Sequence, residues 1–266
     1  MEIRNQRNYR IDNIKAVLIF LVVFGHMLEL IAAKQIYLII YSFHMPAFIF
    51  VTGYYAKFRP RKILLELMMP YILFQTLYLI FEGYTTGEST TFQYMRPYWL
   101  LWYLLTVIIY YILLPMIKTD RMKQRGQIVA LSFAISLLAG YDSTVGYYMS
   151  LSRTMVFLPF FVMGHYAGNS ETKFDVLKKW YHKIAILIGV LLSSYYIITA
   201  QVSSVILYGS YSYEATESGV FQRAVLLIIA FIWILALFRF VPDIKIPILS
   251  DLGKGTFSVF LVHGFI

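Results

Sequence analysis

Apolar residues run along this chain in long stretches rather than in alternation with polar ones. A helix needs ~20 apolar residues to cross a bilayer, whereas a transmembrane β-barrel would show ~10-residue alternating segments. The pattern therefore predicts an all-α, polytopic transmembrane helix bundle. About nine spans are expected, at Ile11 to Ala33, Ile36 to Ala56, Ile63 to Glu82, Pro97 to Ile117, Gln127 to Tyr141, Tyr148 to Gly168, Ile184 to Val202, Val220 to Phe240, and Gly255 to the end.

The last predicted span is incomplete. Gly255 to Ile266 covers only about 18 Å as a helix, against a hydrocarbon core of ~30 Å. No internal repeat or soluble domain interrupts the chain. We therefore expect one membrane-embedded domain over residues 1–266, truncated at its carboxyl-terminal end.

Positive charge marks alternate connections between the predicted spans. Of the 23 Lys and Arg residues, 18 fall at the amino terminus and in alternate loops, while the opposite loops hold only Lys34 and Arg96. Cytoplasmic loops are enriched in Lys and Arg, so this predicts a multi-pass protein of the cell membrane with a cytoplasmic amino terminus. The clusters are Arg4/Arg7/Arg10, Lys57/Arg59/Arg61/Lys62, Lys118/Arg121/Lys123/Arg125, Lys173/Lys178/Lys179/Lys183 and Arg239/Lys245/Lys254.

Composition supports the membrane assignment. The chain is 59% hydrophobic and 14% charged, with a mean hydropathy of +0.66, whereas a soluble domain carries about 25% charged residues. The formal charge of +9 resides in loop clusters, which indicate topology and not a binding surface. The lipid bilayer is therefore expected as a partner, and nucleic acid is not. The chain has no cysteine, which excludes disulfides and thiolate chemistry.

Lys15 and His26 are separated by ten residues inside the first predicted span. Eleven helical residues turn through roughly 1100°, so both groups lie on one stripe about 16 Å apart. Ionisable groups in hydrocarbon are costly and mark functional paths. We expect His26 to act as a general base and Glu29 to fix its tautomer. The alternative for His26 alone is a structural histidine that hydrogen-bonds a neighbouring helix.

Further candidates lie in or near other spans. His44 precedes Pro46 in the second span, where a kink suggests a lined cavity, and it is expected at a depth similar to that of His26. Arg153 and Arg223 lie inside spans and either bind substrate or snorkel to the headgroups.

The cytoplasmic end of the first span carries Arg10, Asp12 and Lys15. Asp12 and Lys15 form a local ion pair in the simpler interpretation. In the functional one, Lys15 and Arg10 receive phosphates that enter from the cytosol.

Most of the aromatic residues near span ends and the remaining histidines are expected to pack or to lie at the interface. Tyr94, Tyr98, Trp99 and Trp102 are typical of an aromatic belt. His165, His182 and His263 are expected to be interfacial or packing residues. No cluster has the spacing of metal ligands, so no metal is expected.

Several blocks, in order, carry a resemblance to a known family. They are Arg10-Ile11-Asp12 with Lys15 and His26, Ser42 to Phe50 with Thr52-Gly53-Tyr54, Trp102-Tyr103-Leu104, Arg153 with Phe157 to Phe161 and Gly164, and Gly253 to Ser258 with Phe260 to Gly264. Together they resemble the integral membrane acyltransferase-3 family, in particular its fucose 4-O-acetylase-like sugar O-acetyltransferases. The resemblance covers nearly the whole chain.

The resemblance implies transfer of an acyl group, most simply acetyl from acetyl-CoA, to a hydroxyl of a cell-surface or secreted glycan or lipid-linked sugar. It implies that His26 is the catalytic histidine, that Lys15 is its paired cation, and that His44 and Arg153 line the cavity. Trp102 is a further candidate for substrate binding. No bound cofactor is expected. The alternative from another class is a proton-coupled transporter or flippase, because buried ionisable stripes serve such pathways too.

Overall fold

The computed structural model describes residues 8–30, 33–87, 91–169, 179–200, 202–216 and 219–265, and every regular element in these ranges is a helix. The prediction of an all-α fold is therefore confirmed for the described part of the chain. Among the basic residues counted above, Arg4, Arg7, Lys173 and Lys178 lie outside these ranges.

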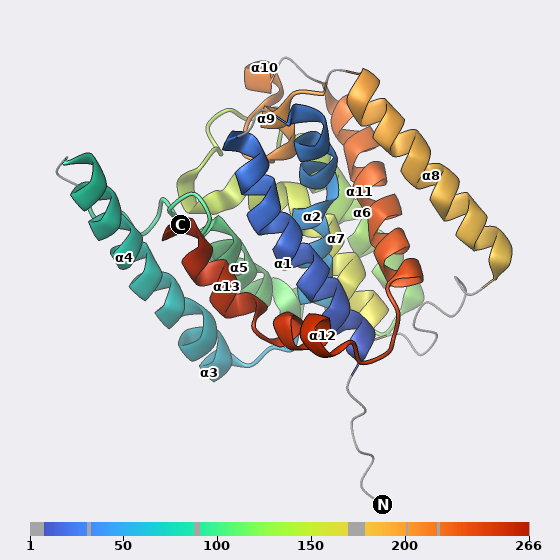
Figure 1. Ribbon diagram of the computed structural model, residues 1–266, viewed down its shortest axis with the longest axis horizontal. Coiled ribbons are helices and arrows are strands. Elements are labelled where there is room, and N and C mark those ends of the chain that lie inside the picture. The colour runs from blue at the N-terminus through green and yellow to red at the C-terminus, as the bar shows by residue number, and fades with distance from the viewer. Residues whose placement is uncertain are drawn as a thin grey trace, which may run out of the picture.

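Long helices form the body of the molecule (Figure 1). They are α1 (Tyr9–Leu30), α2 (Lys34–Tyr54), α5 (Trp102–Ile117), α6 (Met122–Leu138), α7 (Leu151–Gly168), α8 (Trp180–Thr199) and α11 (Val220–Phe240). A further rod consists of α3 (Pro60–Ile63), the π-helical turn η1 (Leu64–Met68) and α4 (Met69–Thr86). The short elements are η2 (Tyr148–Ser150), α9 (Ser204–Leu207), α10 (Tyr213–Thr216), α12 (Pro247–Lys254), α13 (Thr256–Val262) and η4 (His263–Phe265).

The arrangement places α1, α2 and α7 at the centre, with α4 and α8 at opposite edges (Figure 1). The start of α1 and the helices α3 and α12 lie at one end of the bundle, and α9 and α10 lie at the other. We call the first the basic end, because it carries Lys57, Arg59, Lys118 and Arg125. Apolar residues on α4 and α8 remain largely exposed, as expected for helices that face lipid.

Within the described residues, five helical segments are long and apolar enough to cross a membrane: Tyr9–Glu29, Lys34–Tyr54, Pro60–Thr86, Trp180–Thr199 and Val220–Phe240. Helices occupy all nine predicted positions, but the count of nine spans is not confirmed. The helices at the other predicted positions are too short or too polar to count as spans. The helix α5 has 16 residues and spans about 24 Å, which is short of a ~30 Å hydrocarbon core.

Glycines bring α2 and α7 into backbone contact. A Cβ atom on Gly164 would collide with the carbonyl oxygen of Phe50, and one on Gly168 with that of Tyr54. On the facing helix, a Cβ on Gly53 would collide with the carbonyl of Phe161. Small residues four apart allow such close approach in membrane helices, where dispersion and not hydrophobicity drives association. This contact fixes the rotation of α2, and hence the direction in which His44 points.

The short helix α12 is fastened to the start of α1 by a buried amide. The Asn13 side chain is fully buried and donates to the carbonyls of Pro242 and Ile244, at 3.1 and 3.0 Å. Its oxygen accepts a hydrogen bond from Ser250 at 2.8 Å. Gly253 packs directly on the backbone of Asp12. These contacts set the direction in which α13 leaves α12 and returns along α1.

Candidate active site

A cavity of about 60 Å³ lies between α1, α2, α7 and α13, away from the basic end. This volume holds a few water molecules or a group of acetyl size. The cavity combines three imidazoles, one guanidinium and several aromatic rings. The lining residues are Val22, His26, Tyr41, His44, Met45, Trp99, Leu100, Trp102, Arg153, Phe157, Leu207, Tyr208, Phe260 and His263.

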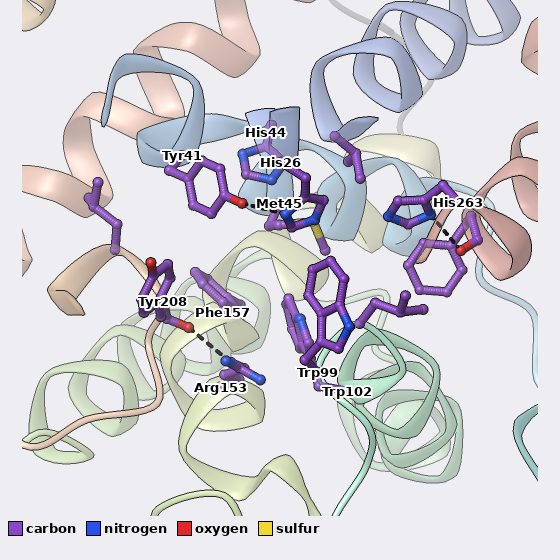
Figure 2. Close-up of a pocket in the computed structure, with 14 residues that line it drawn as sticks. His26, Tyr41, His44, Met45, Trp99, Trp102, Arg153, Phe157, Tyr208 and His263 are labelled. Carbon is purple, nitrogen blue, oxygen red and sulfur yellow. Dashed lines mark hydrogen bonds between the residues drawn. The ribbon is translucent and has the colours of Figure 1, made fainter. Parts of the chain in front are cut away.

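His26 stands at the centre of this cavity, on the face of α1 that meets α2 and α13 (Figure 2). Its Nδ1 shares a hydrogen bond of 2.8 Å with the Tyr41 hydroxyl. The Trp99 ring meets it edge-on at 4.5 Å between centroids, and the His263 ring stacks on it at 5.5 Å. The expected partner Glu29 is exposed instead. The imidazole is therefore held by a phenol from the next helix and not by a carboxylate on its own helix.

His44 enters the same cavity from α2. It is buried, and its Nδ1 lies 2.8 Å from the carbonyl of Ile40. A carbonyl only accepts, so Nδ1 carries the proton and Nε2 holds the lone pair. The structure thus brings His26 and His44 to one cavity, at the similar depth that the sequence predicts, and Pro46 lies within α2 without ending it.

His263 also lines this cavity, where the sequence predicts only a packing or interfacial residue. Its Nδ1 lies 2.8 Å from the carbonyl of Phe260, so this nitrogen also carries the proton. Its Nε2 is buried and has no hydrogen-bond partner within the described residues. A buried acceptor without a partner is costly and calls for a functional explanation. The sequence signal was present, since His263 ends an apolar helix that is part of the family resemblance.

Arg153 lies across the cavity from the histidines, on α7 (Figure 2). Its guanidinium is sandwiched between the rings of Trp102 and Tyr147, 4.9 Å from each centroid. Nε donates to the carbonyl of Tyr208 at 3.1 Å. No carboxylate pairs with it in the described part of the chain, and it is buried, so it does not snorkel. Arg153 is therefore a fixed cation in the lining of this cavity.

The connection that leads into α7 supports this cation. Met149 and Ser150 both adopt positive φ, at 51° and 54°, a conformation that costs a non-glycine residue about 1 to 2 kcal/mol. Burial acts to raise the pKa of the Tyr147 phenol, but hydrogen bonds with Tyr211 and Ser210 and the charge of Arg153 hold it below its usual value. The turn that contains Met149 and Ser150 thus places the Tyr147 ring over the Arg153 guanidinium. No motif or spacing in the sequence singles out Tyr41, Tyr147 or Tyr208.

Trp99 and Trp102, which the sequence places in an aromatic belt, both line the cavity. Trp99 is 43% exposed while its ring edge covers His26, which makes it a cover between the cavity and the outside. Trp102, expected to bind substrate, is buried beneath Arg153 and packs on Phe157.

Arg223 lies in a different place. It lines a separate cavity of about 30 Å³ and is only 2% exposed, so it does not reach the headgroups. One terminal nitrogen donates to the carbonyl of Tyr211 at 3.2 Å, and the guanidinium lies 4.8 Å from the centre of the Tyr213 ring. It is not a lining residue of the cavity that holds His26.

Lys15 lines a second cavity of about 110 Å³ on the side of the basic end. Val22, Met45 and Phe260 line both this cavity and the one around His26, so the two adjoin. The Lys15 ammonium pairs with Asp12 at 3.3 Å, as in the simpler interpretation, and does not enter the His26 cavity.

Arg10 lines neither of these cavities. Its backbone N–H donates to Asp243 at 3.0 Å. Within the described residues, no group of three or more His, Asp or Glu side chains is placed to hold a metal ion.

Apolar helices thus surround a cavity lined by three imidazoles and one guanidinium. Residues 8–266 match the family model described as an acyltransferase domain. The chain therefore belongs to the acyltransferase-3 family. Family membership confirms the resemblance to the acyltransferase-3 family that the sequence motifs indicate.

One curated relative is the nodulation protein NolL of Sinorhizobium fredii (strain NBRC 101917 / NGR234), which is 29% identical over 124 residues. The alignment covers 37% of this chain and 34% of that protein, so the chain spans about a third of the relative's length. No solved structure matches the chain.

Proposed function

We propose that the protein moves an acyl group, most simply acetyl, from cytosolic acetyl-CoA to a hydroxyl of a cell-surface or secreted glycan or lipid-linked sugar, with His26 as general base. The observation that carries this proposal is the meeting of His26 with His44, His263 and Arg153 in one cavity. The cavity of Lys15 adjoins it on the side of the basic end. The thioester enters through that side, and the sugar approaches past Trp99.

The orientation rests on the loop charges. Positive residues gather at the end where α1 begins, and such loops are retained in the cytoplasm. With the amino terminus in the cytosol, the donor meets Lys15 first and His26 last. The acceptor then reaches His26 and Arg153 from the opposite compartment.

The chemistry follows from the hydrogen bonds. If Nδ1 of His26 donates its proton to the Tyr41 oxygen, Nε2 is free to accept. Nε2 takes the proton from the sugar hydroxyl while the oxygen attacks the thioester carbonyl. The carbon–sulfur bond then breaks, and the leaving thiolate takes the proton back from His26. General-base catalysis of this kind contributes roughly 10² to 10⁴ in rate.

Arg153 is placed to stabilise the negative oxygen of the tetrahedral intermediate. A preorganised donor at such a position is worth about 3 kcal/mol. Its guanidinium is held by two rings and a backbone carbonyl, so little reorganisation is needed when charge develops. His44 is the second candidate for this role, because it faces the same cavity.

The test uses purified protein in nanodiscs, labelled acetyl-CoA and glycan from cells that lack this protein. His26→Ala is expected to lower transfer to the glycan by roughly 10² to 10⁴ while the protein stays folded and inserted. The matched control is His182→Ala on α8, a histidine outside the cavity, which should transfer normally. Normal transfer by His26→Ala would refute the proposal.

A further inference from the structure

A much larger cavity opens at the basic end, between the ends of α2, α5 and α7 and the start of α6. Its volume is about 770 Å³, which is within the range of small-molecule sites. It shares no lining residue with the cavities of His26 and Lys15. The lining residues are Ala56, Lys57, Phe58, Arg59, Leu114, Pro115, Lys118, Thr119, Asp120, Arg125, His165, Tyr166 and Asn169.

Positive charge from two separate connections converges on this cavity. Lys57 and Arg59 follow α2, and Lys118 and Arg125 flank the turn between α5 and α6. The carboxylate in the lining is Asp120, whose side chain is fully exposed and lies 3.7 Å from Arg125. In the described ranges, no ion pair involves the other three cations. The cavity therefore carries an excess of positive charge that a bound anion would neutralise.

Arg125 is held in place before any ligand arrives. Its Nε donates to the carbonyl of Thr119 at 3.0 Å, and its guanidinium lies 5.4 Å from the centre of the Tyr166 ring. Tyr166 is itself fixed by a hydrogen bond of 2.7 Å to the carbonyl of Ile117. A planar guanidinium in a fixed position suits the paired oxygens of a phosphate.

We propose that this cavity binds the phosphate groups of a phosphorylated ligand. Its position admits two sources of that chemistry, a soluble nucleotide from the cytosol or the headgroup of an anionic phospholipid. The simpler explanation is that these charges only retain loops in the cytoplasm. The chain itself separates the two explanations, because Arg121 and Lys123 belong to the same basic cluster but do not line the cavity.

The test compares two double variants that each remove two positive charges. Lys57→Ala/Lys118→Ala removes charge from the cavity, and Arg121→Ala/Lys123→Ala removes it from the neighbouring surface. All four side chains are exposed, so both proteins should fold and insert. In the first arm, calorimetry at low salt measures binding of ADP and of inorganic diphosphate to protein in phosphatidylcholine nanodiscs. In the second arm, thermal unfolding is compared in nanodiscs with and without phosphatidylglycerol.

Each lost contact to a phosphate should weaken binding about tenfold or more. The proposal is supported if the wild type responds in either arm and the response is lost in the cavity variant but kept in the surface variant. The arm that responds identifies the source of the phosphate. Absence of a response in both arms overturns it. Equal losses in the two variants overturn it as well, because only general surface charge would then be at work. The proposal does not depend on His26, so its failure would leave the acyl-transfer scheme untouched.

Discussion

Replacing Tyr41 with Phe removes one oxygen atom, the hydrogen-bond partner of His26 Nδ1 at 2.8 Å. Leaving a buried polar group without its partner costs about 1 to 3 kcal/mol. At 1.36 kcal/mol for each factor of ten, this corresponds to a rate loss of about 5-fold to 150-fold if the bond is kept in the transition state. His263 and Trp99 still hold the ring, so we expect a value near the lower end, about tenfold.

The assay is transfer of labelled acetyl groups to the glycan at saturating donor, in single variants and in the double variant with His26→Ala. Groups that act as one unit are not additive, so Tyr41→Phe should have little further effect when His26 is absent. The matched control is Tyr37→Phe. Its hydroxyl bonds Tyr208 at 2.7 Å and its ring stacks on Tyr41, but it does not line the cavity.

Two results would refute this reasoning. If Tyr41→Phe transfers acetyl groups at the wild-type rate, the phenol does not orient the imidazole. If it lowers the rate by the same factor with and without His26, Tyr41 acts on the substrate directly or on the fold, and not through His26.

Three further predictions concern the cation, the helix contact and the buried amide. Arg153→Lys should raise the acceptor KM or lower transfer about tenfold or more. An ammonium cannot reproduce the Nε hydrogen bond to Tyr208 or the position between the Trp102 and Tyr147 rings. Full activity of this variant would contradict the prediction. Gly164→Ala should lower stability by about 1 to 3 kcal/mol in thermal unfolding, whereas Gly126→Ala, where a Cβ meets no atom within 4 Å, should leave it unchanged or raise it. Asn13→Ala should expose the amides of residues 242–250 to hydrogen exchange while α7 stays protected; uniform exchange over the whole chain would show that the amide does not act locally.

Some features of the site could be predicted from single helices. The stripe that joins Lys15 to His26 follows from helical geometry alone, and His44 follows from its depth in an apolar run. Glu29 is predicted from the same single-helix spacing, and the structure places it at an exposed position. Spacing on one helix shows which groups share a face, but not that Tyr41 of the next helix lies closer to the ring.

The sequence by itself determined that the protein is a helical membrane protein of the acyltransferase-3 family, because apolar runs, loop charges and ordered motifs are properties of local segments. Only the tertiary structure decided which polar groups meet. Backbone contact at Gly164 sets how α2 and α7 pack, and Asn13 directs α13 back along α1, so that His263 stacks on His26. Such encounters depend on the rotation and path of whole helices, which packing determines and local sequence does not.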